Sequence, residues 1–397
     1  MSTSKKTVFL FGSGISIPAE LPSTDVLTQI LLSGDGIVRH TDGTYYLSDD
    51  KSGYFLTDEY IPRIVPFLNR IKAEIDAYYS KDSRKTNYED LYYVVSQIRD
   101  SELQEYDNPA IKPLIDKLSP DIKHLLDKRE NDIHDDWTLL DLATESADCI
   151  CDVVWRCLLR PPKRLDHLQL ISEAHNDENI VNIDIFTLNH DILLEQYLSN
   201  INIQVNDGFG PPQENSKRYW KPELFEKSDL KIRLFKLHGS INWFTFISND
   251  KGGLEEIAIP LDWDIWHTMD LNGQRQWPAG GRPKFLAGTF NKILNYSFDV
   301  YADQHCQFHK SLRETGILII CGYGFRDKGI NIKITEWLFA DEQHKLIVID
   351  PKPNELVASA RGVISNNWNT WKAGNKLCVI DKGIEETGWS AIESQLN

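Results

Sequence analysis

The chain has 397 residues, a length that suits one large domain carrying an insertion or two packed units. Hydrophobic residues make up 41% of it and charged residues 26%, which is near the average for globular proteins and excludes a disordered chain. Lysine and arginine total 43 against 59 for aspartate and glutamate, a formal net charge of −16. Such a charge opposes attraction to nucleic acid or anionic lipid, so we expect no direct binding of nucleic acid.

Short apolar runs and scattered cysteines limit the class of protein further. The apolar runs at 8–11 and 317–320 are much shorter than the ~20 residues that span a bilayer, so we expect no membrane segment. The first run leads directly into a glycine turn and lacks the features of a secretory signal, which favours a cytoplasmic protein. No C-x-x-C pair occurs, so we expect no zinc site. We expect reduced, mostly buried thiols at Cys149, Cys151, Cys157, Cys306, Cys321 and Cys378.

The pattern of apolar residues changes along the chain. Residues 7–11 predict a short strand, which is followed by a glycine turn and a helix-start signal at Ser23. From about 56 to 169, apolar residues recur at steps of three and four, as in amphipathic helices. Continuous apolar runs typical of buried parallel strands follow at 180–186, 232–237, 317–321 and 345–349.

These patterns predict an α/β fold, a doubly wound Rossmann-like parallel sheet with a large helical insertion. Residues 1–55 and 170–397 would form the Rossmann-like domain, and residues 56–169 the helical insertion. Residues 220–281 are rich in aromatic residues, glycine and proline and show no clear period. We expect long ordered loops there, near a site or an interface.

The first chemical signal is the turn Gly12-x-Gly14-x-Ser16, directly after the first strand. Glycines let the backbone approach a pyrophosphate, and a helix N-terminus supplies N–H donors for it. A dehydrogenase fingerprint needs another glycine three positions after Gly14, where this chain has Ile17. Hydride transfer is therefore disfavoured, and a tight turn without a ligand stays open as an alternative.

Polar residues also follow the second and third strands. Thr187, Asn189 and Asp191 come directly after the run at 180–186, where open α/β sheets place their ligand groups. Capping of the next helix is the alternative for Thr187 or Asn189. His238, which follows the run at 232–237, is a side chain able to accept a proton near neutral pH, and a structural hydrogen-bonding role is its alternative.

The fourth and fifth strands end in further candidates. Gly322, Tyr323 and Phe325 follow the run at 317–321, and Asp350 ends the run at 345–349 with a carboxylate suited to a ribose hydroxyl. The nearby Asp327 and Asn331 suit either the site or the first turn of a helix. His305 and His309 lie four residues apart without an HExxH pattern, and we expect them at the surface.

The ordered set of motifs resembles the sirtuins. The glycine turn with Leu21-Pro22 resembles the sirtuin dinucleotide loop, and the segments at 187–191 and 237–239 resemble the catalytic Asn/Asp motif and the histidine motif. A Lys-Leu-His-Gly-Ser segment at 236–240 and a Gly-Tyr-x-Phe-x-Asp-x-x-Ile-Asn segment at 322–331 resemble the divergent bacterial sirtuin-like branch most. The motifs extend from residue 7 to about 350, with the helical insertion outside the shared pattern.

This resemblance implies an NAD hydrolase that releases nicotinamide and ADP-ribose, of the kind that depletes NAD in anti-phage defence. It also implies a possible HerA-type hexameric ATPase as a separate partner, since this chain has no Walker A motif. We hypothesise that Asn189 orients the ribose and the water, His238 acts as general base and Asp191 holds the surrounding network. The residues expected to contact NAD are Gly12, Ser13, Gly14, Ser16, Thr187, Gly322, Tyr323, Phe325 and Asp350.

Departures from the family weaken one alternative. Deacylating sirtuins carry a four-cysteine zinc module, and they carry Asp-Phe-Arg where this chain has Ser23-Thr24-Asp25. A protein deacylase is therefore the weaker enzyme hypothesis, and a non-catalytic module that binds NAD or ADP-ribose is a further one. Nucleic-acid cleavage has little support, because the sequence shows no clear cluster of metal-binding carboxylates. The helical insertion would offer a surface for a homo-oligomer.

Overall fold

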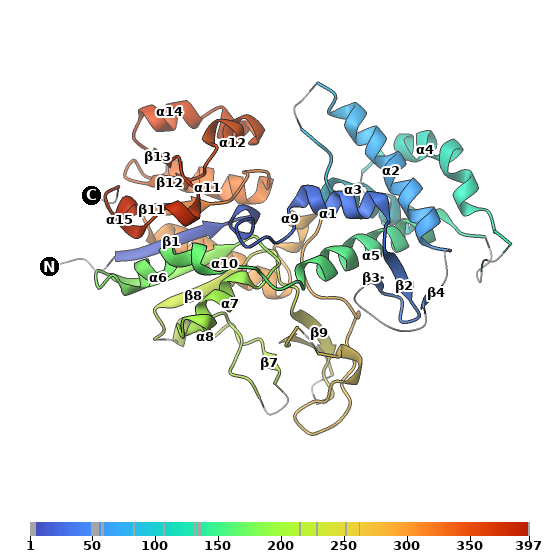
Figure 1. Ribbon diagram of the computed structural model, residues 1–397, viewed down its shortest axis with the longest axis horizontal. Coiled ribbons are helices and arrows are strands. Elements are labelled where there is room, and N and C mark those ends of the chain that lie inside the picture. Colours follow the sequence, from blue (N-terminus) through green and yellow to red (C-terminus); the bar gives the residue numbers. More distant parts are fainter. Residues whose placement is uncertain are drawn as a thin grey trace. The chain divides into compact units, whose positions relative to one another are not determined.

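The computed structural model describes residues 5–48, 55–56, 59–81, 84–105, 108–130, 132, 136–213, 216–227, 229–250, 252–261 and 263–395. Internal contacts divide the chain into two compact units, and Figure 1 labels most of their elements. Unit 1 comprises Met1–Leu21, Pro161–Leu286 and Ile293–Asn397. Unit 2 comprises Pro22–Arg160 and Ala287–Lys292.

Unit 1 is built on a seven-stranded sheet in the described part of the chain, with strand order β13-β12-β11-β1-β5-β8-β6. All neighbouring strands in it are parallel. The chain adds strands on one side of β1 and later on the other, which is the topology of a doubly wound sheet. The strands are β1 (Lys5–Phe11), β5 (Ile180–Thr187), β6 (Val205–Asn206), β8 (Ile232–Lys236), β11 (Ile317–Cys321), β12 (Lys345–Ile349) and β13 (Leu377–Ile380).

Helices cover both faces of this sheet. Alternate residues of β1 enter different apolar clusters, Phe9 and Phe11 in one, Val8 and Leu10 in the other, because side chains alternate along a strand. The first cluster includes residues of α6 (Gln169–Asn176), α7 (Leu193–Asn200) and α15 (Trp389–Glu393). The second includes residues of α10 (Asp299–Glu314), α11 (Lys328–Ala340), α12 (Pro353–Ser359), α13 (Gly362–Ser365) and α14 (Trp368–Ala373). The predicted fold class is confirmed.

Unit 2 is mainly helical. Helix α2 (Ile61–Tyr78) buries Ile64, Leu68 and Ile71, at the three- and four-residue steps that predicted a helix here. Capping boxes at Asn87 and Thr138 begin two of the others. The helices are α1 (Thr24–Ser33), α2 (Ile61–Tyr78), α3 (Tyr88–Glu102), α4 (Ile111–Leu126) and α5 (Leu139–Leu158), and β2 (Ile37–His40), β3 (Tyr45–Leu47) and β4 (Phe55–Leu56) form a small antiparallel sheet.

The division into units differs from the boundaries expected at 56 and 169. Unit 2 begins at Pro22, because α1 packs against α2, α3 and α5 and the small sheet packs against α5. It ends at Arg160, because the following α6 places Leu170 and Ile171 in the core of the large sheet. Amphipathic periodicity could not reveal this, since it marks helices without showing which core they join.

The region 220–281 contains more regular structure than the sequence indicated. Strands β9 (Trp243–Ile247) and β10 (Leu254–Ala258) pair antiparallel, and β10 also pairs with β7 (Arg218–Tyr219). The expectation of loops was therefore wrong for these segments. Aromatic residues of the region pack together instead, with Phe209, Trp220 and Trp243 in one apolar cluster, so they stabilise a small sheet.

Two features of other protein classes are absent from the described ranges. No helix there is long and apolar enough to cross a membrane. The same ranges hold no group of three or more His, Cys, Asp or Glu side chains placed to bind a metal ion. All six cysteines are free; Cys149, Cys157 and Cys321 are buried, whereas Cys306 is exposed.

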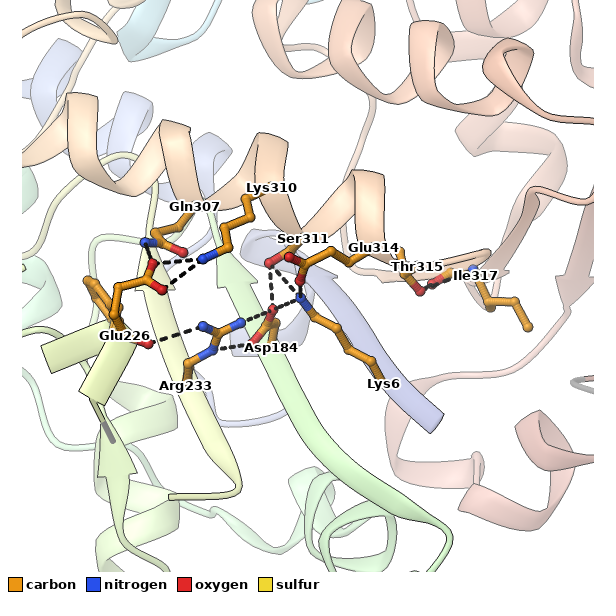
Figure 2. A network of polar contacts seen from close by, with 11 residues as sticks. Lys6, Asp184, Glu226, Arg233, Gln307, Lys310, Ser311, Glu314, Thr315 and Ile317 are labelled. Carbon is orange, nitrogen blue, oxygen red and sulfur yellow. Dashed lines mark hydrogen bonds and ion pairs between the residues drawn. The ribbon is translucent and has the colours of Figure 1, made fainter. Parts of the chain in front are cut away.

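A buried carboxylate joins three strands of the sheet to a helix (Figure 2). Asp184, on β5, is fully buried, and its two oxygens accept hydrogen bonds of 2.7 Å each from Arg233 on β8. Lys6 on β1 lies 2.8 Å from the same carboxylate, and the Ser311 hydroxyl on α10 donates to it. Burial by itself would raise the pKa of Asp184, but Arg233 and Lys6 outweigh burial and hold that pKa below its ordinary value.

We expect Asp184→Asn to lower the free energy of unfolding by about 3–5 kcal/mol, because it leaves two cations without their carboxylate. The lowered pKa means that the carboxylate stabilises the fold above its unfolded pKa of about 4 and that this contribution is lost as pH falls. Urea unfolding from pH 7 to pH 3 should therefore bring the two proteins closer at low pH. The exposed Asp229→Asn serves as control, and an equal effect of both substitutions at pH 7 would contradict this account.

Candidate functional site

The carboxyl ends of five strands form one edge of the large sheet. Phe11 of β1 pairs in register with Cys321 of β11 on one side and Thr187 of β5 on the other. Thr187 in turn pairs with Lys236 of β8, and Cys321 pairs with Ile349 of β12. The segments singled out in the sequence begin at these positions or just after them. The sheet therefore brings them together along a single edge, where doubly wound folds bind their ligands.

Three glycines let the loops after β1 and β11 touch through their backbones. The Gly12 N–H donates to Cys321 O over 3.0 Å, and the Gly14 N–H donates to Gly322 O over 2.9 Å. A Cβ at Gly12 would lie 2.6 Å from Gly322 O, and one at Gly14 would lie 2.6 Å from Gly322 Cα. Gly322 itself has a φ of +65°. This contact explains the three glycines, and their binding of a pyrophosphate stays a prediction.

Ser16 links Asn189 to Asp191. The Asn189 Nδ2 donates to Ser16 Oγ over 3.0 Å, and Ser16 Oγ donates to Asp191 Oδ2 over 2.8 Å. All three residues are buried, and Asn189 Oδ1 accepts no hydrogen bond from the described residues. Because a buried acceptor without a donor is costly, this oxygen is suited to a ligand hydroxyl or a water.

Neighbouring side chains hold this loop in place. Thr187 Oγ1 accepts from the Asn189 N–H, and Asp191 Oδ1 accepts from the Leu193 N–H at the start of α7. Side-chain capping by Asn189, the alternative weighed for it, is not what the structure shows. Lys236, almost fully buried, donates to Asp191 O and forms an ion pair of 3.0 Å with Glu195. Burial raises the pKa of Glu195 although Lys236 opposes that shift.

His238 lies next to a tyrosine and a carboxylate. Its Nε2 is 3.1 Å from Tyr296 Oη and 3.3 Å from Asp327 Oδ2. The Tyr296 hydroxyl donates to the same Asp327 oxygen over 2.8 Å. Asp327 also caps α11, because its Oδ1 accepts from the Ile330 N–H. The helix cap weighed for Asp327 is therefore present, and its part in the site stays a prediction.

His305 lies in the interior and not at the surface, so that expectation was wrong. It is 3% exposed, its ring stacks on Tyr296 with centroids 3.8 Å apart, and its Nε2 is 3.2 Å from Leu237 O. Burial, followed by the positive charges of Lys333 and His238, holds the pKa of His305 well below its ordinary value. His309, four residues on, is exposed as expected.

Two aromatic candidates belong to the core. Phe325 is fully buried in the apolar cluster beside α11 and lies edge-on to Trp368. Tyr323 is buried in the same cluster, and its hydroxyl donates to Asn331 Oδ1 over 2.8 Å. These contacts explain both side chains by packing, so a part in binding NAD would fall to the backbone of their loop. Asn331 also donates to Phe325 O and thereby fixes the loop against α11.

Ser13 and Asp350 are the remaining candidate residues. Ser13 is exposed and begins a short 3₁₀ helix, Ser13–Ser16. Asp350 is partly buried at the end of β12, where its Oδ1 accepts from the Lys352 N–H over 2.7 Å. Burial, together with the charge of Asp381, raises the pKa of Asp350. Both stay predictions as ligands of NAD.

Sequence reasoning missed Tyr296 and Glu195. Tyr296 lies in a segment without a motif, between two helices, and reaches His238 only through the packing of the fold. Glu195 lies in the first turn of α7, where a charged residue ordinarily faces solvent. The sequence feature that could have revealed Glu195 was Lys236, because a lysine at the end of a buried strand needs an acidic partner.

Two cavities lie away from this edge. One of about 260 Å³ lies at the amino ends of β1 and β11, beside Lys6 and Ile317. The other, of about 720 Å³, lies in unit 2 and is lined by Arg39, Tyr60 and Trp137 among others. We place the candidate site by its converging polar side chains, because parallel sheets bind ligands at the carboxyl ends of their strands.

Residues 184–373 match the family model of the SIR2-like domain, a little less than half of the chain. This segment contains Asn189, His238 and Asp327 but not the glycine loop after β1. Over these residues the chain is similar to the SIR2-like domain. No curated protein sequence matches the chain significantly.

Solved structures of Sir2 homologues align with the chain at low similarity. A mutant Sir2 homologue in complex with ADP-ribose is 11% identical with a TM-score of 0.37, covering 100% of this chain and 93% of that chain. A Sir2 homologue in complex with NAD is 10% identical with a TM-score of 0.37, covering 100% and 91%. At these values the similarity carries no argument about ligands or activity.

We expect Gly322→Ala to destabilise the protein by more than the ~1–2 kcal/mol typical of a left-handed backbone, because its Cβ would also lie 2.5 Å from the Ile15 nitrogen. Gly324→Ala, in the same loop, is the matched control. Its φ is not positive, and its Cβ would meet nothing nearer than Arg326 Cγ at 3.9 Å. Denaturant unfolding measures both, and equal stabilities of the two variants would contradict the close loop contact.

Proposed function

We propose that this SIR2-like domain hydrolyses NAD to nicotinamide and ADP-ribose. One observation carries the proposal most: Ser16, Asn189 and Asp191 form a hydrogen-bonded set at the carboxyl edge of the sheet, in which a buried acceptor, Asn189 Oδ1, has no donor among the described residues. His238 follows the adjacent strand β8. The family model, which covers Asn189 and His238, supports an NAD-dependent enzyme.

The reaction breaks the bond between nicotinamide and C1′ of the ribose, and positive charge develops on the sugar as in glycoside hydrolysis. Nicotinamide leaves as a neutral molecule with the bonding electron pair, and a water oxygen bonds to C1′. A site for this reaction must hold the ribose, place one water and accept its proton. Neutral polar groups and a base are sufficient for these tasks.

We assign these tasks to residues of the site. Asn189 Oδ1 would accept a hydrogen bond from the ribose or from the attacking water, and Ser16 and Asp191 hold the amide in position. His238 would take the proton directly or through a ribose hydroxyl. Asp350 and the loops at Gly12 and Gly322 would face the rest of the dinucleotide.

The wider biological context is proposed on the resemblance to the divergent sirtuin-like branch. On this proposal the protein would deplete cytoplasmic NAD in anti-phage defence, with a HerA-type hexameric ATPase as a separate partner. We also propose a homo-oligomer formed through the helical unit. Light scattering at micromolar concentration tests this last point, and a monomeric mass would contradict it.

We expect Asn189→Ala and His238→Ala each to reduce nicotinamide release from NAD by about 10²–10⁴, without any acylated peptide present. Release is followed by chromatography. The exposed Asn200→Ala, at the end of α7, and the exposed His309→Ala, on α10, are matched controls that should keep wild-type rates. Thermal unfolding of each variant establishes that the chain is folded.

The alternatives predict different results. A deacylase would release nicotinamide only in the presence of an acylated peptide. A non-catalytic module would bind NAD in calorimetry without turnover, also after addition of a HerA-type ATPase. Wild-type turnover in folded His238→Ala would refute the role of this histidine.

A further inference from the structure

We propose that Asp327 and Tyr296 are positioning residues that hold the neutral His238 ring in one tautomer, with its proton on Nε2 and the lone pair on Nδ1. The tautomer follows from contacts of the protein alone. Its use in catalysis rests on the proposed function, in which His238 accepts a proton.

The tautomer follows from counting protons among three atoms. His238 Nε2, Tyr296 Oη and Asp327 Oδ2 lie within 3.3 Å of one another, at 3.1, 2.8 and 3.3 Å. An ionised carboxylate brings no proton, and the single tyrosine proton goes to that carboxylate. Without a proton on Nε2, its lone pair would face two oxygen acceptors. Nε2 therefore carries a hydrogen and donates it, which leaves the lone pair on Nδ1.

The two partners are themselves held in place. Asp327 Oδ1 accepts from the Ile330 N–H over 2.9 Å, so the carboxylate cannot rotate without uncapping α11. The Tyr296 ring stacks on His305 and lies close to Gly329, where a Cβ would come within 2.7 Å of Tyr296 Cε2. Gly329 thus allows the tyrosine to lie against the first turn of α11.

This arrangement also suits the charged form of His238. When Nδ1 takes a proton from water or a ribose hydroxyl, the ring becomes an imidazolium whose Nε2–H still faces the Asp327 carboxylate. The oxygen left behind bonds to C1′ as nicotinamide departs, and the proton later passes to solvent. Other titratable groups of the described residues around this cluster include His305, Lys333 and His190, whose ring is centred 6.3 Å from that of His238.

Asp327→Asn is the decisive substitution, because the helix cap fixes the orientation of the new amide. Asparagine caps helices as well as aspartate does, so its oxygen should keep the bond from Ile330 N–H. Its NH₂ group then replaces Oδ2 and points a donor at Tyr296 and His238. The tyrosine proton turns to Nε2, and the histidine proton moves to Nδ1.

Long-range ¹H–¹⁵N NMR of protein with ¹⁵N-labelled histidine distinguishes the two tautomers without any substrate. The signal that is missing in His238→Gln is the signal of His238. We expect the Nε2–H form in the wild type and in Tyr296→Phe, where Asp327 can accept directly. We expect the Nδ1–H form in Asp327→Asn. Asp341→Asn, at the other end of α11, is the matched control and should give the wild-type spectrum. A wild-type Nδ1–H form, or an unchanged tautomer in Asp327→Asn, would overturn the proposal.

Nicotinamide release then tests whether the tautomer matters for turnover. Asp327→Asn should lower kcat by about 10²–10⁴ with little change in KM, and Tyr296→Phe should lose less than about tenfold. A changed tautomer with unchanged kcat would refute the catalytic role of His238 while leaving the positioning intact. A wild-type protein without NAD turnover would count against the proposed function alone, because the NMR result does not depend on it.

Discussion

The backbone contact between the loops after β1 and β11 is the constraint on which the candidate site depends. Gly12 and Gly14 meet Gly322 so closely that a Cβ at any of them would overlap the opposite loop. This closeness keeps the 3₁₀ turn that carries Ser16 over the end of β1. Ser16 in turn joins Asn189 and Asp191, which come from the loop after β5. A side chain at the glycine contact would thus disturb three loops together.

Buried charged side chains of the sheet region are paired at two levels. Deeper in the sheet, Asp184 binds Arg233 and Lys6 and so ties β5 to β8 and β1. At the edge, Lys236 joins Asp191 to Glu195, and Asp327 joins His238 to α11. Since each buried charge has a partner, the loops are held by contacts that are costly to break. Asn189 Oδ1 has no donor among the described residues, and its place beside Ser16 at the carboxyl edge of the sheet supports its use by a ligand.

The candidate site combines groups with distinct tasks that general acid–base chemistry can use. In the function proposed above, Asn189 would offer an acceptor held by Ser16, and His238 would offer a base whose proton is held on one nitrogen. A base held in one tautomer needs no rearrangement when it takes a proton, and a nearby carboxylate balances the charge that forms. The neutral His305 stacked behind Tyr296 adds no opposing charge.

The sequence by itself determined the doubly wound sheet and the strand ends at which Asn189, His238 and Asp350 lie, because continuous apolar runs mark buried parallel strands and end where polar residues begin. It could not place the division of units at Pro22 and Arg160, nor the interior position of His305. Only the tertiary structure joined Asn189 to Ser16 across 173 residues and Tyr296 to His238 across 58. Such pairs depend on strand order and on how helices pack against the sheet, which local periodicity does not encode.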